Sequence, residues 1–290
     1  VENTVDGKFF VTARGWEDLS EILKSYEELQ VEIGEELIGE FLQKEEIARD
    51  FAGYYRLYEK YKSDYQIQEI LDGNVTSRQL KTCCDMGKKA SFEERFTVTE
   101  MLLEAVTERI SSFQKTDEKT EKLYGNLKLL KVFLQEKNSV EAMEQFIVSR
   151  RKALDAKICS ELLTAEEAAR EEEQIRILEE YFFQLKELHI SDVAEGIEQI
   201  GERFGNVCRL RNEKLEETKK MLEQAFSFLE ECFGEGQELL LFETGLTGDD
   251  RCSIFISQYG CPSYFKHCEL LLYSKKENEL RKECRDLLEE

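Results

Sequence analysis

A single proline, Pro262, stands in a chain of 290 residues, and this scarcity constrains the fold more than any other feature of the sequence. Proline interrupts helices and is common in the turns that join short strands. Charged residues make up 35% of the chain. Apolar residues recur at three- and four-residue steps over long stretches, which is the period of an amphipathic helix. The sequence therefore predicts an all-α protein.

The charge balance argues against two classes of partner. The sequence holds 62 acidic against 40 basic residues, which gives a formal net charge of −22. This excess of negative charge repels phosphate backbones and anionic lipid head groups. No apolar run approaches the roughly 18 residues that a membrane-spanning helix needs. We therefore expect neither nucleic acid nor a membrane as a partner.

The nine cysteines do not predict a disulfide framework. Their number is odd, the chain is long, and no apolar region leads into a cleavage site near the N-terminus. We therefore expect reduced thiols and a cytoplasmic location. The chain opens on Val1 instead of methionine, which looks like a cut after a lost leader or a whole lost domain.

Residues 1–75 predict a small helical domain. Thr12 is the expected N-cap of a helix that ends near Leu29. Further helices are expected at 35–43 and 45–72, and Gly73 with the following asparagine ends the second of them. The inner stripe of the 45–72 helix is expected to consist of Ile47, Phe51, Tyr54, Tyr55, Tyr58, Tyr61 and Tyr65.

Residues 76–91 are polar and contain glycine, so they are expected to form a linker. An elongated antiparallel bundle of long helices is predicted for 92–233, with helices at 92–113, 118–136, 139–158, 164–189 and 191–233. "TAEE" at Thr164 fits a capping box, and the last helix carries a near-heptad apolar stripe. Residues 234–290 predict short helices that pack on this bundle. The apolar run 238–246 fits a strand or a helix, and the all-α context favours a helix.

One group of side chains could bind a metal. Cys252, Cys261, His267 and Cys268 fall within 17 residues, and thiolates with an imidazole are zinc ligands. The chain has no C-x-x-C pair, however, and the adjacent His267 and Cys268 point to different sides of a helix. We therefore expect buried structural cysteines and no metal site.

Signatures of catalysis are weak. The only histidines are His189 and His267, and no G-x-S-x-G is present. The acidic run Glu171–Glu173 is typical of a solvated helix face. The sequence also lacks G-x-x-x-x-G-K-[ST], so nothing in it cradles the phosphates of a nucleotide, and this chain alone is not expected to hydrolyse ATP.

The vicinal Cys83-Cys84 is expected to be exposed in the linker. The tyrosine stripe is expected to pack in a core or against a partner helix.

Two stretches carry a resemblance to a known family. "FVTARGWEDLSEILKSYEEL" is followed by "IGEELIGEFLQKEEIARDFAGYYRLYEKYKSDY", and together they resemble the helical lid that follows the nucleotide-binding core in MoxR-type AAA+ ATPases of clostridial-type bacteria. The later "FGEGQELLLFETGLTGDDRCSIFISQYGCPSYFKHCELLLYS" resembles the C-terminal extension of that subgroup. Residues 92–230 are supported mainly by their helical pattern.

The resemblance implies a role for Arg14. In such lids the first helix opens with an arginine followed by a Trp-Glu pair, as in Arg14, Trp16 and Glu17 here, and this sensor 2 arginine reaches the γ-phosphate of ATP. An arginine in the first turn opposes the helix dipole, so Arg14 is misplaced on local grounds unless it faces an anion. Trp16 would then be the packing anchor that fixes the helix. The alternative is a surface arginine before a core tryptophan.

The resemblance also implies a larger protein. The Walker motifs, sensor 1 and arginine finger lie outside this chain, so it would be the non-catalytic C-terminal portion of a chaperone-like ATPase that uses ATP and Mg²⁺. Expected partners are the upstream AAA+ core, further copies in a ring, and a protein with a von Willebrand factor A domain. Two alternatives remain: a stand-alone acidic helical adaptor with no nucleotide role, and a thiol-ligated metal protein.

Overall fold

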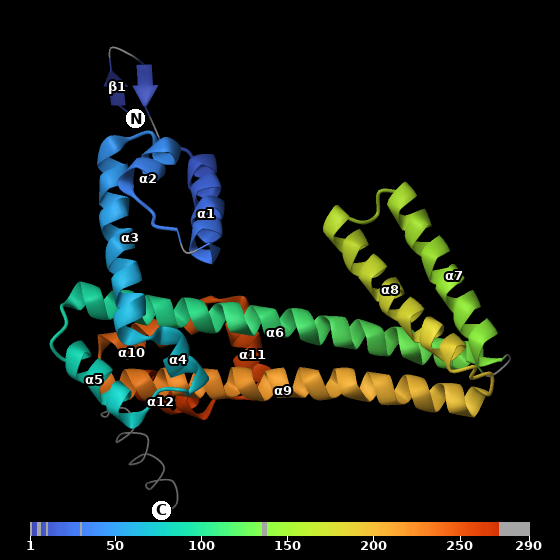
Figure 1. The fold of residues 1–290 in the computed structure, drawn as a ribbon. Coiled ribbons are helices and arrows are strands. Elements are labelled where there is room, and N and C mark those ends of the chain that lie inside the picture. Colours follow the sequence, from blue (N-terminus) through green and yellow to red (C-terminus); the bar gives the residue numbers. More distant parts are fainter. Residues whose placement is uncertain (1, 5–6, 10, 30, 135–137, 273–290) are drawn as a thin grey trace, which may run out of the picture. The chain divides into compact units, whose positions relative to one another are not determined.

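The computed structural model describes residues 2–4, 7–9, 11–29, 31–134 and 138–272. Within these residues the chain forms twelve helices and one two-stranded hairpin (Figure 1). The expectation of an all-α protein is confirmed. None of the described helices is both long and apolar enough to cross a membrane.

The chain forms two compact units, and each combines two stretches that are distant in the sequence. Among the described residues, the first unit contains those up to Leu103 together with Ser227–Phe242, and the second contains those between Glu104 and Phe226 and those from Glu243 onward. The domains expected from the sequence, 1–75, 76–91, 92–233 and 234–290, follow one another along the chain. They do not anticipate that Ser227–Phe242 packs with the N-terminal stretch.

Three helices form the core at the start of the first unit. They are α1 (Ala13–Glu28), α2 (Glu35–Leu42) and α3 (Glu45–Tyr65), preceded by the antiparallel strands β1 (Glu2–Thr4) and β2 (Gly7–Phe9). Thr12 caps α1 as predicted, since its side chain accepts a hydrogen bond from the Gly15 amide. The buried core consists of Leu19, Leu23, Ile38, Leu42, Ala48, Ala52 and Tyr55.

The predicted helix 45–72 is wrong in two respects. It breaks at Gln66, which adopts the left-handed conformation (φ 51°), and a separate helix α4 (Ile67–Asp72) ends at Gly73. Tyr55 and Tyr65 of the predicted stripe are buried, but Tyr54 is 47% exposed and the rest of the buried face of α3 consists of Ala48 and Ala52. Small side chains let the neighbouring helices approach closely, so alanines occupy the interface.

The expected linker 76–91 is mostly a helix, α5 (Ser77–Gly87). The side chain of Thr76 accepts a hydrogen bond from the Gln79 amide, and the Gln79 side chain accepts one from the Thr76 amide, which makes a capping box. Cys83 and Cys84 are buried on this helix, so the prediction that they are exposed is wrong. The capping pattern was present in the sequence and was the available signal for α5.

The predicted helices 92–113 and 118–136 are one helix, α6 (Phe92–Leu134). The polar residues between them contain no glycine or proline, so nothing in the backbone ends the helix there. Three further long helices match the prediction closely: α7 (Ser139–Cys159), α8 (Ala165–Glu187) and α9 (Val193–Phe233). The capping box of α8 at Thr164 is confirmed.

In the second unit, α7 and α8 form an antiparallel hairpin (Figure 1). This hairpin contributes most of a core that also includes parts of α6 and α9, with Leu123, Leu130, Phe146, Leu178 and Ile200 among its buried side chains. Of the segment 234–290, for which short helices were predicted, the described part forms α10 (Gln237–Gly248), α11 (Asp250–Tyr259) and α12 (Pro262–Leu272). Residues 273–290 lie outside the described residues. The run 238–246 is therefore helical. Pro262 occupies the first position of α12, where its missing amide hydrogen would have had no helical partner.

Candidate functional site

Arg14 lies in the first turn of α1, two residues after the Thr12 cap. Its side chain is 87% exposed, and its ion pair in the described structure is with Asp18, at 3.7 Å between Nε and Oδ2. Asp18 is itself 51% exposed, and ion pairs between exposed side chains are weak. The guanidinium of Arg14 therefore carries a positive charge that points to solvent at the positive end of the α1 dipole.

Gly15 fixes the position of this turn. A Cβ atom built on Gly15 would lie 2.8 Å from the carbonyl oxygen of Phe41 in α2 and 3.3 Å from Oγ1 of Thr12. The start of α1 thus lies directly against the end of α2, and only glycine fits at this contact. The backbone that carries Arg14 is held by both the Thr12 cap and this close approach.

Trp16 is not the buried anchor that the sequence led us to expect. Its side chain is 39% exposed, and its ring packs edge-on against Phe51, with 5.1 Å between the centroids. Phe51 in turn lies beside Tyr54 and Tyr55. Trp16 therefore lies at the exposed end of a group of aromatic side chains that includes the buried Tyr55, because the buried positions of α1 are Leu19 and Leu23.

The four side chains weighed as candidate metal ligands are Cys252, Cys261, His267 and Cys268. Within the described part of the chain, no three His, Cys, Asp or Glu side chains lie close enough together to hold a metal ion. Cys252 contacts the hydroxyl of Thr107, and Cys261 lies 3.2 Å from Oε1 of Glu223. The ring of His267 stacks on Phe226, with 5.8 Å between their centroids. Cys252, Cys261 and His267 thus each have a structural neighbour, whereas Cys268 is only half-buried.

Burial dominates the acid–base properties of these groups. It raises the pKa of the Cys252 thiol to about 11 and that of the Cys261 thiol to about 12. Burial also raises the pKa of Glu243, whose side chain is 2% exposed, while the nearby His267 opposes this effect. Thiols that keep their protons at neutral pH are poor nucleophiles and poor metal ligands.

A polar cluster that no sequence pattern indicated joins α6, α9 and α11 in the second unit. Arg211 donates hydrogen bonds to Asp117 and to the hydroxyl of Tyr259, each at 2.7 Å, and the Tyr259 hydroxyl donates to Asp117 at 2.9 Å. The guanidinium also lies over the rings of Phe113 and Tyr259. The hydrogen bond with Asp117 raises the pKa of Arg211. Every polar group here is paired within the cluster, so it ties three helices together.

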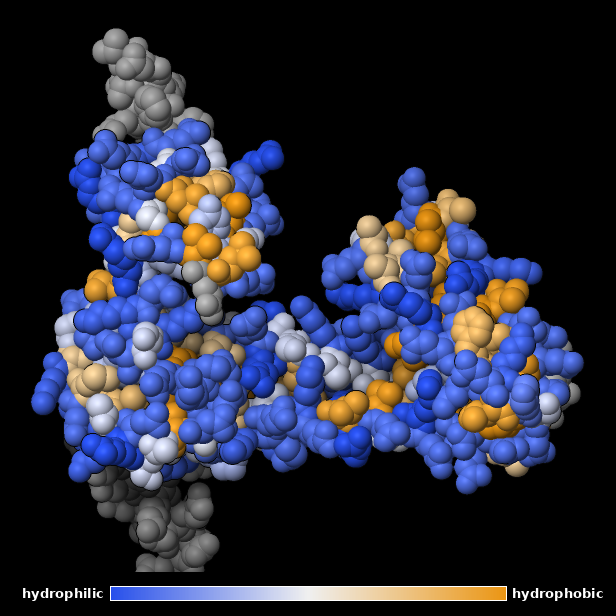
Figure 2. Space-filling view, viewed as in Figure 1, coloured by the Kyte–Doolittle hydropathy of each residue, from blue (hydrophilic) through white to orange (hydrophobic). Residues whose placement is uncertain are grey.

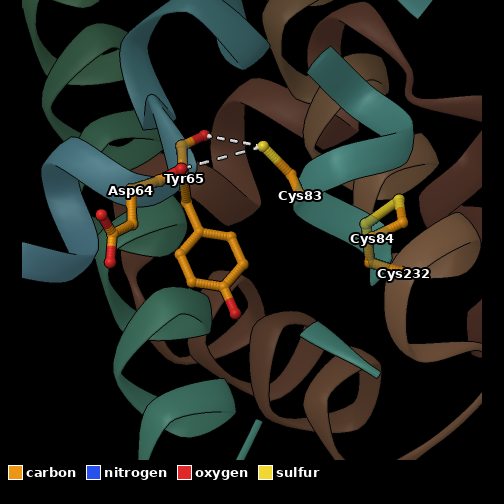
Figure 3. The surroundings of a disulfide bond; sticks show 5 residues. All are labelled: Asp64, Tyr65, Cys83, Cys84 and Cys232. Carbon is orange, nitrogen blue, oxygen red and sulfur yellow. Dashed lines mark hydrogen bonds between the residues drawn. A yellow bond between two sulfur atoms is a disulfide. The ribbon is translucent and has the colours of Figure 1, made fainter. Parts of the chain in front are cut away.

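The first unit holds a disulfide between Cys84 of α5 and Cys232 of α9 (Figure 3). The prediction that all cysteines are reduced is therefore wrong for this pair. The two residues are 148 positions apart, so no local pattern could have paired them. Cys159, Cys208 and Cys268 are among the free cysteines, as are Cys83, Cys252 and Cys261.

Hydrophilic side chains cover most of the face seen in Figure 2, and apolar ones also gather over the α7–α8 hairpin. Four large apolar side chains of this hairpin are exposed: Val148 (45%), Ile158 (48%), Leu162 (72%) and Phe183 (60%). We call these four residues the hairpin patch. The four residues lie on both helices and on the loop between them, and such exposed apolar side chains are candidates for contact with another protein.

Comparison with known proteins matches the chain to no family model, to no curated protein and to no solved structure.

Proposed function

We propose that the chain is the C-terminal, non-catalytic portion of a MoxR-type AAA+ chaperone-like ATPase, with α1–α3 as a lid in which Arg14 senses nucleotide. The observation that carries this proposal is the exposed guanidinium of Arg14 in the first turn of α1. Its charge opposes the helix dipole. An anion from outside the chain would offset this unfavourable placement, and the γ-phosphate of ATP is such an anion.

The position of Arg14 suits this role. The Thr12 cap and the contact of Gly15 with Phe41 hold the backbone, while the side chain keeps its freedom. Releasing Arg14 from Asp18 would require little energy, because both side chains are largely exposed. An arginine that reaches a phosphoryl group from a separate element stabilises the charge of the transition state.

The remaining parts of the proposal concern the longer protein. An AAA+ core upstream of Val1 would bind ATP and Mg²⁺, and copies of the whole protein would assemble into a ring in the cytoplasm. The hairpin patch on α7 and α8 would contact a client or a partner such as a protein with a von Willebrand factor A domain. The exposure of its four apolar side chains supports this role.

The upstream reading frame tests the proposal. We expect a P-loop domain to be encoded before Val1, and the purified longer protein to hydrolyse ATP. An initiation codon within a few residues of Val1, with no P-loop domain, would contradict the proposal.

A second candidate is a stand-alone acidic adaptor that binds proteins and never meets nucleotide. The hairpin patch favours it, because this surface needs no ATPase core to bind a partner. The two candidates differ in what Arg14 does: in an adaptor, removal of its charge changes nothing that depends on ATP.

A further inference from the structure

The Cys84–Cys232 disulfide joins the two stretches that make up the first unit. Cys84 belongs to the stretch that ends at Leu103, and Cys232 belongs to Ser227–Phe242. A cross-link between residues 148 positions apart closes a long loop, and such a loop strongly restricts the unfolded chain. The disulfide is thus a covalent bond between the two stretches of the first unit, which are distant in the sequence.

The helices also touch beside the disulfide. A Cβ atom built on Gly87, one turn after Cys84, would lie 2.8 Å from the ring of Phe233, so α5 and the end of α9 are in direct contact. An ion pair follows nearby in the sequence: Arg95 of α6 lies 3.2 Å from Glu238 of α10, whose side chain is only 6% exposed. Without the disulfide, Ser227–Phe242 would depend on such non-covalent contacts.

The Cys83 thiol does not exchange with the Cys84–Cys232 disulfide. Figure 3 shows its Sγ directed away from the disulfide, toward the carbonyl oxygens of Tyr65 at 3.7 Å and Asp64 at 4.0 Å. Burial raises the pKa of the Cys83 thiol, so little thiolate is present to attack the neighbouring bond. The disulfide therefore stays between Cys84 and Cys232 instead of shifting to the vicinal pair.

We propose that the Cys84–Cys232 bond is a reversible redox latch that holds Ser227–Phe242 on the rest of the first unit. A dithiol reductant opens it: the bond between the two sulfurs breaks, each sulfur takes up one proton and one electron, and the reductant becomes a disulfide. Cys84 and Cys232 are 6% and 2% exposed, so the reductant reaches them only when α5 and α9 separate locally. The oxidation state of Cys84 and Cys232 therefore determines how readily α5 and α9 separate.

Hydrogen exchange of the 290-residue chain tests the proposal without nucleotide, so its result is separate from the role of Arg14. Three forms are compared: the oxidised chain, the chain after dithiothreitol treatment, and the double variant Cys84→Ser, Cys232→Ser. Amides of α5 and of 227–242 are expected to exchange at least about tenfold faster in the reduced chain and in the double variant. Amides of α8, in the second unit, serve as the internal reference and are expected not to change.

Cys83→Ser is the matched control, because it removes a buried thiol from the same helix and leaves the disulfide intact. Alkylation of this variant after unfolding without reductant should leave Cys84 and Cys232 unlabelled, as in the unaltered chain. Reduction by dithiothreitol should accelerate in dilute urea, because urea favours the opened state. Equal exchange of α5 in the oxidised and reduced chains would overturn the proposal, and so would full alkylation of Cys84 and Cys232 in a chain equilibrated with oxidised dithiothreitol.

Discussion

Replacement of Gly15 by alanine tests the contact that holds Arg14 in place. The added methyl group would lie 2.8 Å from the Phe41 carbonyl oxygen and 3.3 Å from the Thr12 hydroxyl oxygen. The first distance is to backbone, which cannot swing aside as the end of a side chain can. Forcing atoms into a packed contact destabilises a protein by about 1 to 3 kcal/mol.

The intrinsic preference of alanine for helices acts in the opposite direction. It amounts to about 1 kcal/mol in a helix interior and less near a helix start. The net result expected for Gly15→Ala is therefore a loss of about 1 to 2 kcal/mol in the free energy of unfolding.

Gly53 in α3 provides the matched control. It lies in a helix of the same unit, but a Cβ atom built on it meets no atom within 4 Å. Gly53→Ala is expected to stabilise the protein by about 0.5 to 1 kcal/mol. Urea unfolding followed by circular dichroism measures both variants. If Gly15→Ala is as stable as Gly53→Ala, the start of α1 does not lie against the end of α2 and the reasoning fails.

Three further predictions follow from exposure, burial and composition. Trp16→Ala should lower the free energy of unfolding by only about 1 to 2 kcal/mol, less than the 3 to 5 kcal/mol of a buried ring, because the indole is 39% exposed; a larger loss in urea unfolding would mean that Trp16 is a core residue. Burial raises the pKa of the Cys261 thiol from 9.0 to about 12 in the folded chain. The unfolded chain therefore loses this proton at lower pH, and the free energy of unfolding should fall between pH 9 and 12 by about 1.4 kcal/mol per pH unit. Cys261→Ala should reduce that slope between pH 9 and 10.5, and an unchanged slope would contradict the assignment. The purified 290-residue chain should release no phosphate from ATP in a coupled assay, since its sequence lacks a phosphate loop, and turnover that survives repeated purification would refute this.

Helix periodicity and capping residues predicted much of the fold. The caps at Thr12 and Thr164 and the end of a helix at Gly73 lie where the sequence indicated, because caps depend on a few adjacent residues. The left-handed conformation of Gln66 was not predictable in the same way. Glutamine seldom adopts this conformation, so no residue preference at position 66 predicts the break.

Contacts between residues that are far apart in the sequence could not be predicted from a single sequence. Cys84 meets Cys232 across 148 residues, and Asp117 meets Arg211 across 94. Both pairs arise because long helices bring distant residues to the same place. Hydrophobic periodicity predicts each helix, but it does not predict which other helix packs against it. Arg14 became a candidate through its resemblance to a family motif, whereas its exposure could be established only from the structure.

ATP turnover by the longer protein with Arg14→Ala is the most direct test of the proposed sensor. Arg49→Ala is the matched control, since Arg49 is another exposed arginine of the same unit and pairs with Glu35 and Glu45. The account predicts that Arg14→Ala lowers turnover by about tenfold or more while unfolding stays within about 0.5 kcal/mol of the unaltered protein, and that Arg49→Ala keeps its turnover. Full turnover and unaltered nucleotide affinity in the Arg14→Ala protein would contradict the assignment of Arg14 as a nucleotide sensor.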